Sequence, residues 1–228
     1  MQVRRPALVA LGLGALACAW LMPWQALLGG GFSAHMTMHM SVVAVAAPLL
    51  ALGLSGSTFD PVLRAPRLFS PLPASVVELL VVWGWHAPAL HHAARHSTAV
   101  LLLEQGSFLA SGLLVWLAAF GGTASGRADR GGAGVVALLL TSMHMTLLGA
   151  LLALPPRVLY QHPGHAGAWL SPLADQHLGG AIMLVIGGVA YLSGGLFLML
   201  ELLGRARSRA EGELPPKALA ARPQRGER

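Results

Sequence analysis

The sequence predicts an all-α, polytopic membrane helical bundle, and three observations support this prediction. Apolar residues make up 55% of the 228 residues and charged residues only 11%, and the mean hydropathy is +0.63. Soluble domains contain about 25% charged residues. The apolar residues also gather in runs of about 20, the length at which a helix crosses a bilayer.

Six apolar segments qualify as transmembrane helices, at about residues 6–28, 34–54, 73–90, 98–120, 135–154 and 177–203. Each ends where the composition changes: at glycines 29–31, the Pro- and Arg-containing 55–72, the His-rich 91–97, the Gly-rich 121–134 and the Pro- and His-rich 155–176. Residues 1–203 are thus predicted to form the bundle. Residues 204–228 are basic, contain Pro215 and Pro216 and have little apolar surface, so we expect a mobile tail.

The first segment has two interpretations. Arg4 and Arg5, the apolar run and the small residues near 15–17 are typical of a cleaved signal peptide. The run continues through Trp20 and Trp24, however, and is then long enough to span. We favour a retained helix, whereas cleavage would leave five spans and unchanged loops.

The distribution of positive charge predicts the orientation. If both termini are cytoplasmic, thirteen of the fifteen Lys and Arg residues lie on the cytoplasmic side, and only Arg95 and Arg157 lie outside. The net charge of +6 would suggest nucleic acid in a soluble protein. Here the basic residues flank apolar segments, so we expect a lipid bilayer and no nucleic acid as the partner.

The run His35-Met36-Thr37-Met38-His39-Met40 opens the second apolar segment. Ionisable groups at membrane depth usually serve in pairing, proton transfer or ion binding. Residues four apart share one helical face, so His35 and His39 can point to the same place, with Met38 beside that face. Imidazole and thioether together suit copper, above all Cu(I).

Residues 37–41 and 142–146 share the pattern hydroxyl-Met-His-Met-hydroxyl. We favour a metal site shared by His39 and His144, although methionine is also a common filler of core gaps. His86 beside Trp85 is either a ligand or an interfacial residue. The histidines in the predicted outer loops, His91, His92, His96, His162 and His165, are expected to be solvated.

Three acidic residues need an explanation. Glu104 lies at membrane depth and needs a partner, for which Arg95 or a histidine is expected. Asp175 precedes the sixth segment and is expected to be its N-cap. Glu78 stands three residues after Ser75 and fits a capping box, with no chemistry assigned.

Several function classes lack their signals. Cys18 is the one cysteine, which excludes an internal disulfide and a CxxC clamp. The sequence has no phosphate-binding GxxxxGK[ST] loop, HExxH helix or GxSxG elbow, so an enzyme is the less economical interpretation. A haem-binding membrane cytochrome and a metal permease remain as alternatives to a metal-binding protein.

Several stretches together resemble a known family. They are residues 32–40, 47–50 and 85–90, then Glu104, Phe108, Gly112 and Trp116, and finally 149–152, 159–160 and 175–183. In this order they are similar to the multi-span bacterial cytochrome c oxidase assembly factors, the CtaG family. Members often have Gln where this chain has His177, which adds a potential ligand.

The resemblance implies a role in making active haem-copper oxidase, by handling copper. On this reading the protein lies in the bacterial inner (plasma) membrane and binds copper at its extracytoplasmic side. Its partner would be an oxidase subunit or an extracytoplasmic copper donor. His35 and His39 are the leading ligands, Met38 or Met36 is the thioether donor, and candidates to complete the site are His86, His144 and His177.

Overall fold

The computed structural model describes residues 4–28, 31–160 and 169–212. All regular structure in these residues is helical, which confirms the predicted all-α class. The α-helices are α1 (Arg4–Leu21), α2 (Trp24–Leu28), α3 (Gly31–Met40), α4 (Ala47–Leu54), α5 (Pro61–Arg64), α6 (Pro71–Trp85), α7 (Pro88–His96), α8 (Thr98–Phe120), α9 (Ala124–Ala153), α10 (Pro172–Ile182) and α11 (Gly188–Gly212). Two π-helical segments, η1 (Ser41–Ala46) and η3 (Met183–Gly187), and a 3₁₀ turn, η2 (Pro66–Leu68), complete them.

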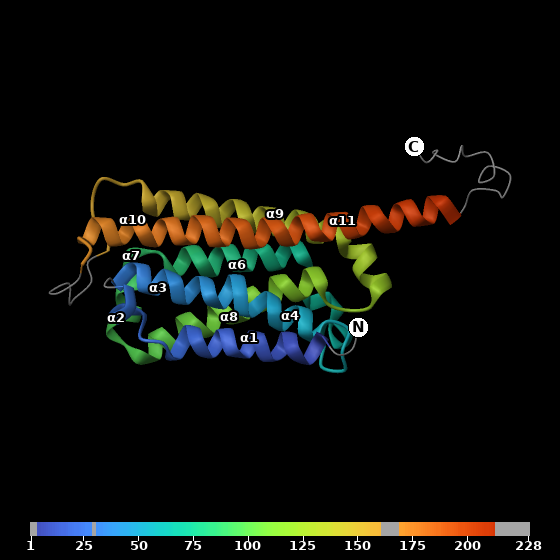
Figure 1. Ribbon diagram of the computed structural model, residues 1–228, viewed down its shortest axis with the longest axis horizontal. Coiled ribbons are helices and arrows are strands. Elements are labelled where there is room, and N and C mark those ends of the chain that lie inside the picture. Colours follow the sequence, from blue (N-terminus) through green and yellow to red (C-terminus); the bar gives the residue numbers. More distant parts are fainter. Residues whose placement is uncertain (1–3, 29–30, 161–168, 213–228) are drawn as a thin grey trace, which may run out of the picture.

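The long helices lie side by side as an elongated bundle (Figure 1). Four continuous helices in the described part are long and apolar enough to cross a membrane, namely Gly31–Leu54, Thr98–Phe120, Ala124–Ala153 and Pro172–Ala210. Arg5–Leu21 and Pro71–Trp85 are apolar but shorter. The protein is therefore a helical membrane protein, and the count of six spans stays a prediction.

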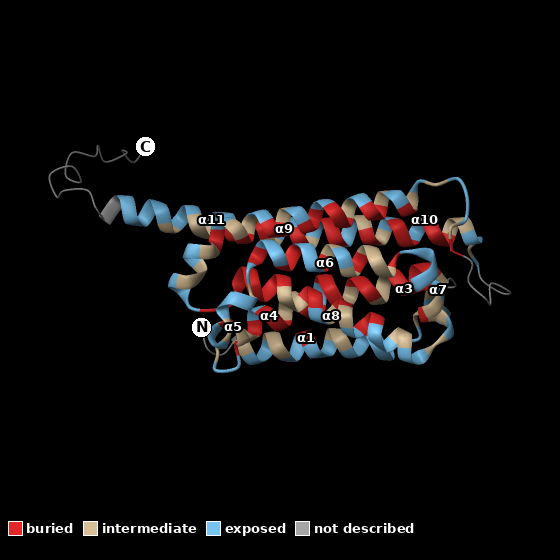
Figure 2. Ribbon diagram, turned by 180° about the vertical axis from the view of Figure 1, so that it is seen from behind, coloured by how far each residue is buried: buried red, intermediate tan, exposed pale blue. Residues whose placement is uncertain are grey.

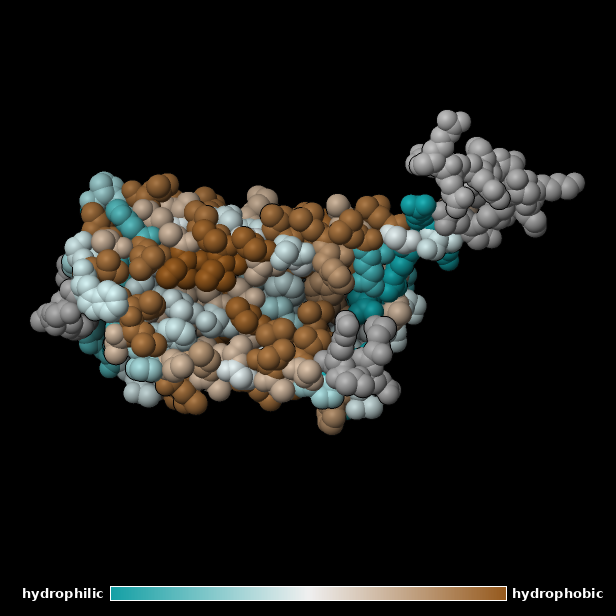
Figure 3. All heavy atoms as spheres, viewed as in Figure 1, coloured by the Kyte–Doolittle hydropathy of each residue, from teal (hydrophilic) through white to brown (hydrophobic). Residues whose placement is uncertain are grey.

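Polarity is distributed as a bilayer requires. Buried residues line the inside of the bundle, and exposed residues lie on its outside (Figure 2). Large apolar side chains such as Leu80, Leu102 and Leu200 are 65%, 68% and 65% exposed. Apolar side chains also cover much of the face shown in Figure 3. Lipid tails accept such a surface, which in water would be an aggregation hazard.

The two ends of the bundle differ. The start of α1 and the end of α11 lie at one end, which we call the arginine end, while α2 and α7 lie at the other, the histidine end (Figure 1). At the arginine end, Arg127 and Arg130 donate to the carbonyls of Phe120 and Gly121. Arginine caps of this kind satisfy carbonyls at a helix C-terminus.

Close packing of α9 against the last helix depends on glycines. A Cβ at Gly149 would lie 2.6 Å from the backbone nitrogen of Leu184, and one at Gly180 would lie 2.5 Å from that of Ala153. Small residues allow such approach between membrane helices. On the other side of α10, a Cβ at Gly179 would lie 2.5 Å from the ring of Phe32, so α10 also packs closely against α3.

The π-helical segment η1 has a structural consequence. A π turn lets carbonyls escape the regular helical ladder. The carbonyl of Val43 accepts from Trp116 Nε1 at 3.1 Å and from the hydroxyl of Tyr191 at 3.3 Å. The widened turn, which begins directly after Met40, is thereby tied to α8 and α11.

Several boundaries differ from the prediction. The His-rich segment 91–97 is not a loop: Pro88, a favourable first residue of a helix, starts α7, which runs through His96. Helix α9 starts at Ala124, capped by Thr123, so most of the Gly-rich breaker is helical. The predicted mobile tail is helical from 204 to Gly212, because α11 continues beyond the bundle (Figure 1). Residues 213–228 lie outside the described part.

The capping box predicted for Ser75 and Glu78 is wrong. Ser70 is the N-cap residue of α6 and Pro71 is its first residue. Ser75 and Glu78 therefore lie inside that helix, and both are buried. Ser75 Oγ is 3.0 Å from Thr141 Oγ1, and Glu78 accepts from the hydroxyl of Tyr191. A pattern of Ser and Glu spaced by three is equally compatible with two buried polar residues on one helical face.

Candidate metal centre

The N-terminus of α3 is fixed by a carboxylate from another helix. Asp175 on α10 accepts from the backbone nitrogens of Phe32 and Ser33 at 2.9 and 3.0 Å, and from Ser33 Oγ at 2.5 Å. The N-cap of α10 itself is Ser171, so Asp175 caps a different helix from the one predicted. A carboxylate at a helix N-terminus satisfies its free N–H groups, and here it sets the rotation of α3.

Four buried imidazoles meet at the histidine end. His35 and His39 come from α3, His86 ends α6 and His91 lies in α7; we call these four residues the histidine cluster. Their exposed fractions are 2%, 0%, 4% and 3%. Ring centroids of His35 and His91 are 4.8 Å apart, those of His39 and His86 5.5 Å, and those of His35 and His39 6.4 Å. The sequence-based expectation that His35 and His39 share a face agrees with this geometry.

Five ring nitrogens of His35, His39 and His86 have no hydrogen-bond partner in the part of the chain that the structure describes. Among the described residues, neither ring nitrogen of His35 or His39 has a hydrogen-bond partner, and the same holds for His86 Nε2. Leaving a buried polar group unsatisfied costs about 1–3 kcal/mol. Five such atoms in one cluster are costly if the imidazoles only pack, so they favour a site that binds a ligand.

His86 is oriented as metal-binding histidines usually are. Its Nδ1 lies 2.6 Å from the carbonyl oxygen of Val82. A carbonyl can only accept, so Nδ1 carries the proton and Nε2 keeps its lone pair. Histidine ligands of metals typically donate their other N–H to a carbonyl or carboxylate in this way.

A carboxylate adjoins the cluster. Glu104 on α8 is fully buried, and its Oε2 accepts from Arg95 at 2.5 Å and from Gln105 Nε2 at 3.3 Å. The same oxygen is 3.8 Å from His35 Nδ1. The expectation that Glu104 pairs with Arg95 or a histidine is confirmed. Burial lowers the pKa of Arg95, and the negative charge of Glu104 opposes that shift.

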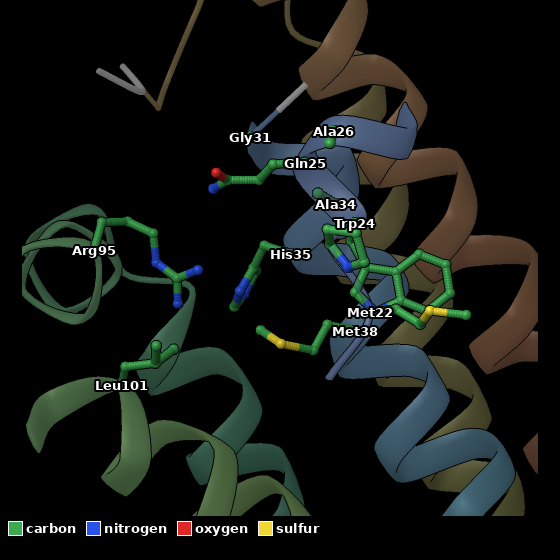
Figure 4. Close-up of a pocket in the computed structure, with 11 residues that line it drawn as sticks. Met22, Trp24, Gln25, Ala26, Gly31, Ala34, His35, Met38, Arg95 and Leu101 are labelled. Atoms are coloured by element: carbon green, nitrogen blue, oxygen red, sulfur yellow. The ribbon is translucent and has the colours of Figure 1, made fainter. Parts of the chain in front are cut away.

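A cavity of about 500 Å³ reaches the cluster from the side of α2. Its lining includes His35, Met38, Arg95, Gln25 and Trp24. The thioether of Met38 and the guanidinium of Arg95 point toward the space next to His35 (Figure 4). The cavity therefore brings the thioether of Met38 and the guanidinium of Arg95 close to the same imidazole, that of His35.

Aromatic residues cover the cluster on another side. Tyr160 stacks on Phe32 with centroids 4.6 Å apart and meets the edge of His91 at 4.8 Å. Its hydroxyl donates to the carbonyl of His86 at 2.5 Å, and burial raises the pKa of Tyr160 to about 12. Phe108 packs on His39 with centroids 3.9 Å apart. These contacts restrict water and hold the imidazoles in place.

The remaining predicted residues lie elsewhere. Met36 is fully buried and points to α10, since a Cβ at Gly179 would be 3.0 Å from its Cγ. His177 Nε2 donates to the carbonyl of Pro155 at 2.9 Å. His144 is 6% exposed, and within the described ranges it has neither a hydrogen bond nor a ring contact with the cluster. His162 and His165 lie outside the described residues.

Sequence reasoning missed His91. It was expected to be a solvated loop residue, but it is buried in α7 next to His35. The available signal was Pro88, which favours a helix start and places His91 and Arg95 on one helical face, while His92 and His96 share another. The last two are exposed, as expected.

Comparison with known proteins identifies the family. The family model described as cytochrome c oxidase caa3 assembly factor (Caa3_CtaG) matches residues 1–205. The chain belongs to this family. A search of curated proteins and a search of solved structures gave no match. The resemblance noted in the sequence is thus confirmed, and the histidine cluster is a feature of a caa3 oxidase assembly factor.

Proposed function

We propose that this caa3 assembly factor binds copper, as Cu(I), in the histidine cluster and hands it on during oxidase assembly. The observation that carries the proposal is the convergence of buried imidazole nitrogens without hydrogen-bond partners among the described residues. The transfer exchanges ligands and needs no covalent chemistry. The copper is cargo, and the partner is an oxidase subunit or an extracytoplasmic copper donor.

His35, His39 and His86 are the proposed nitrogen donors, with Met38 as the thioether. Imidazole nitrogens bind metals at about 2.0–2.1 Å, so rings that share one ion have centroids about 5–6 Å apart. The three rings are 5.5–6.4 Å apart, and a small inward movement closes the set. Soft thioether with imidazole favours Cu(I), and Met38 adjoins the cavity, where ligand exchange is possible.

The proposed topology places the histidine end outside the cytoplasm. Thirteen of the fifteen Lys and Arg residues then lie on the cytoplasmic side, in agreement with the positive-inside rule. Both termini are cytoplasmic, six helices span the bacterial inner membrane, and copper is exchanged at the extracytoplasmic face.

The direct test is the copper content of the detergent-purified protein. The variant His35→Ala/His39→Ala is expected to lose copper, since it removes two of the proposed donors. His92→Ala/His96→Ala is the matched control: it removes another histidine pair spaced by four, exposed at the same end, with ring centroids 4.0 Å apart. Unchanged copper in the first variant contradicts the proposed site.

The role in assembly has its own test. A strain without this protein is expected to lack caa3 oxidase activity in copper-poor medium and to recover part of it with added copper. The wild-type gene restores activity, whereas the His35→Ala/His39→Ala variant does not. Normal activity in the deletion strain without supplementation contradicts the assembly role.

A metal permease is the second candidate, because a buried carboxylate lies apart from the histidine cluster, further along α6 from His86. Glu78 is fully buried, and its Oε2 has no partner among the residues described. Copper uptake into proteoliposomes separates the two functions: a permease transports the ion, whereas a binding protein only retains it. A haem-binding cytochrome is distinguished by the absorption spectrum of the purified protein.

A further inference from the structure

A second donor set adjoins the cluster on the side of α7. His35, His91 and Glu104 each offer one ligand atom, and these atoms lie within 4.8 Å of one another. The three side chains are at most 3% exposed. Two nitrogens and a carboxylate oxygen form a harder set than His with Met, and they suit divalent ions such as Cu²⁺, Zn²⁺ or Co²⁺.

The two carboxylate oxygens of Glu104 have different surroundings. Its Oε2 accepts from Arg95 and Gln105, and Gln105 in turn accepts from Trp20 Nε1 at 3.3 Å. Its Oε1 is buried with no hydrogen-bond partner among the described residues. Partners of this kind orient metal-binding carboxylates. The oxygen that lies 3.8 Å from His35 Nδ1 is Oε2, the same atom that accepts from Arg95.

Arg95 provides the positive charge that Glu104 needs in this structure. A buried carboxylate is costly without a positive partner, and the Arg95 guanidinium lies 2.5 Å from Glu104 Oε2 with 14% of its side chain exposed. Arg95 and His91 are four residues apart on α7, which brings both to the same place. Arg95 also borders the cavity opposite Met38, so it has space into which it can withdraw (Figure 4).

We infer that His35, His91 and Glu104 form a second station for a metal ion, and that Arg95 occupies the carboxylate as a substitute cation until an ion binds. An ion at this station repels the guanidinium and takes over the neutralisation of Glu104. His35 also belongs to the proposed Cu(I) site, so the two donor sets share one imidazole. The divalent station does not depend on the proposed function, and no ion is required to pass between the two sets.

Co²⁺ is the probe, because its visible absorption reports ligation and its binding does not depend on copper handling. Purified full-length protein is titrated with Co²⁺ in detergent. Removing the competing charge in Arg95→Gln is expected to tighten Co²⁺ binding about tenfold or more. Glu104→Gln is expected to weaken it about tenfold or more, and the double variant to match Glu104→Gln alone. Arg157→Gln, an exposed arginine, is the control.

A folding defect in Arg95→Gln does not remove the test. Glu104→Gln and His91→Ala are then compared with His39→Ala: the first two lose the Co²⁺ bands, while His39→Ala keeps them and loses Cu(I). Unchanged or weaker Co²⁺ binding in a folded Arg95→Gln, or bands that persist in Glu104→Gln and His91→Ala, overturns the second station. Absent Cu(I) binding with intact Co²⁺ effects overturns the proposed function instead.

Discussion

The segments Thr37–Ser41 and Ser142–Thr146 have the same pattern of residue types but different surroundings. His39 lies among other imidazoles and is fully buried, whereas His144 has no ring contact with them in the described part of the chain. Met38 lines the cavity, whereas Met143 is 65% exposed on the flank. The residue pattern defines donor types, but neighbouring helices decide whether donors converge.

The two segments both pack against Gly187. A Cβ at Gly187 would lie 3.1 Å from Met145 Cβ and 3.5 Å from Met40 Sδ. Met40 and Met145 are both fully buried there, beside the π-helical segment η3. Methionines fill irregular gaps well, and this contact is consistent with packing. Under the proposed function, the segment around His39 contributes to the copper site, whereas the segment around His144 packs in the core.

The largest expected difference concerns the two histidines. His39→Ala is expected to weaken Cu(I) binding about 100-fold or more, because removal of a ligand costs at least as much as removal of its supporting residues. His144→Ala, which removes an equally buried imidazole, is expected to change the affinity less than about threefold. Competition with a chromophoric Cu(I) chelator measures both. Equal losses would mean that the two segments share one ion.

The second prediction tests the packing role of the helix that carries His144. Gly149→Ala forces a Cβ against the backbone of Leu184 and is expected to destabilise the fold by about 1–3 kcal/mol. Gly84→Ala is the control, since a Cβ there meets nothing within 4 Å. Thermal unfolding in detergent compares them. A stable Gly149→Ala would contradict the tight contact of α9 with η3.

The third prediction concerns the methionines. Met38→Leu keeps the side-chain volume but removes the thioether, so Cu(I) affinity is expected to fall about three- to tenfold with little change in stability. Met143→Leu, on the exposed flank, should change neither quantity. The chelator competition assay applies again. If the two substitutions have the same effect, Met38 is not a ligand.

The smallest expected effect is that of Tyr160→Phe. It removes the hydroxyl that donates to the carbonyl of His86 but keeps the ring against Phe32 and His91. One buried hydrogen bond contributes about 1 kcal/mol, so the unfolding temperature should fall slightly. Cu(I) affinity should change less than about threefold. A large loss of affinity would make Tyr160 part of the site rather than its cover.

Much of the fold could be predicted because apolar runs of span length form helices in a bilayer whatever their partners. Boundaries were harder to predict, since most of segments 91–97 and 121–134 is helical although these segments are polar or Gly-rich. Pro88 and Thr123 start these helices. Capping residues decide where such helices begin, and the composition of a segment does not reveal them.

The site could be predicted only as far as one helix determines it. The spacing of His35 and His39 implies a shared face, and membrane depth implies a partner for Glu104. The approach of His91 and His86, and the separation of His144 from His39, depend on how four helices pack, which a single sequence does not encode locally. Asp175 likewise caps a helix more than a hundred residues away in the chain, so no short-range pattern could reveal its role.

The most direct test of the central claim is X-ray absorption spectroscopy at the copper edge on Cu(I)-loaded wild type, His39→Ala and His144→Ala. We expect imidazole nitrogens with one sulfur around the ion in wild type and in His144→Ala, and a changed or absent copper environment in His39→Ala. A sulfur-only environment, or a spectrum that changes with His144→Ala and not with His39→Ala, would contradict the assignment of copper to the histidine cluster.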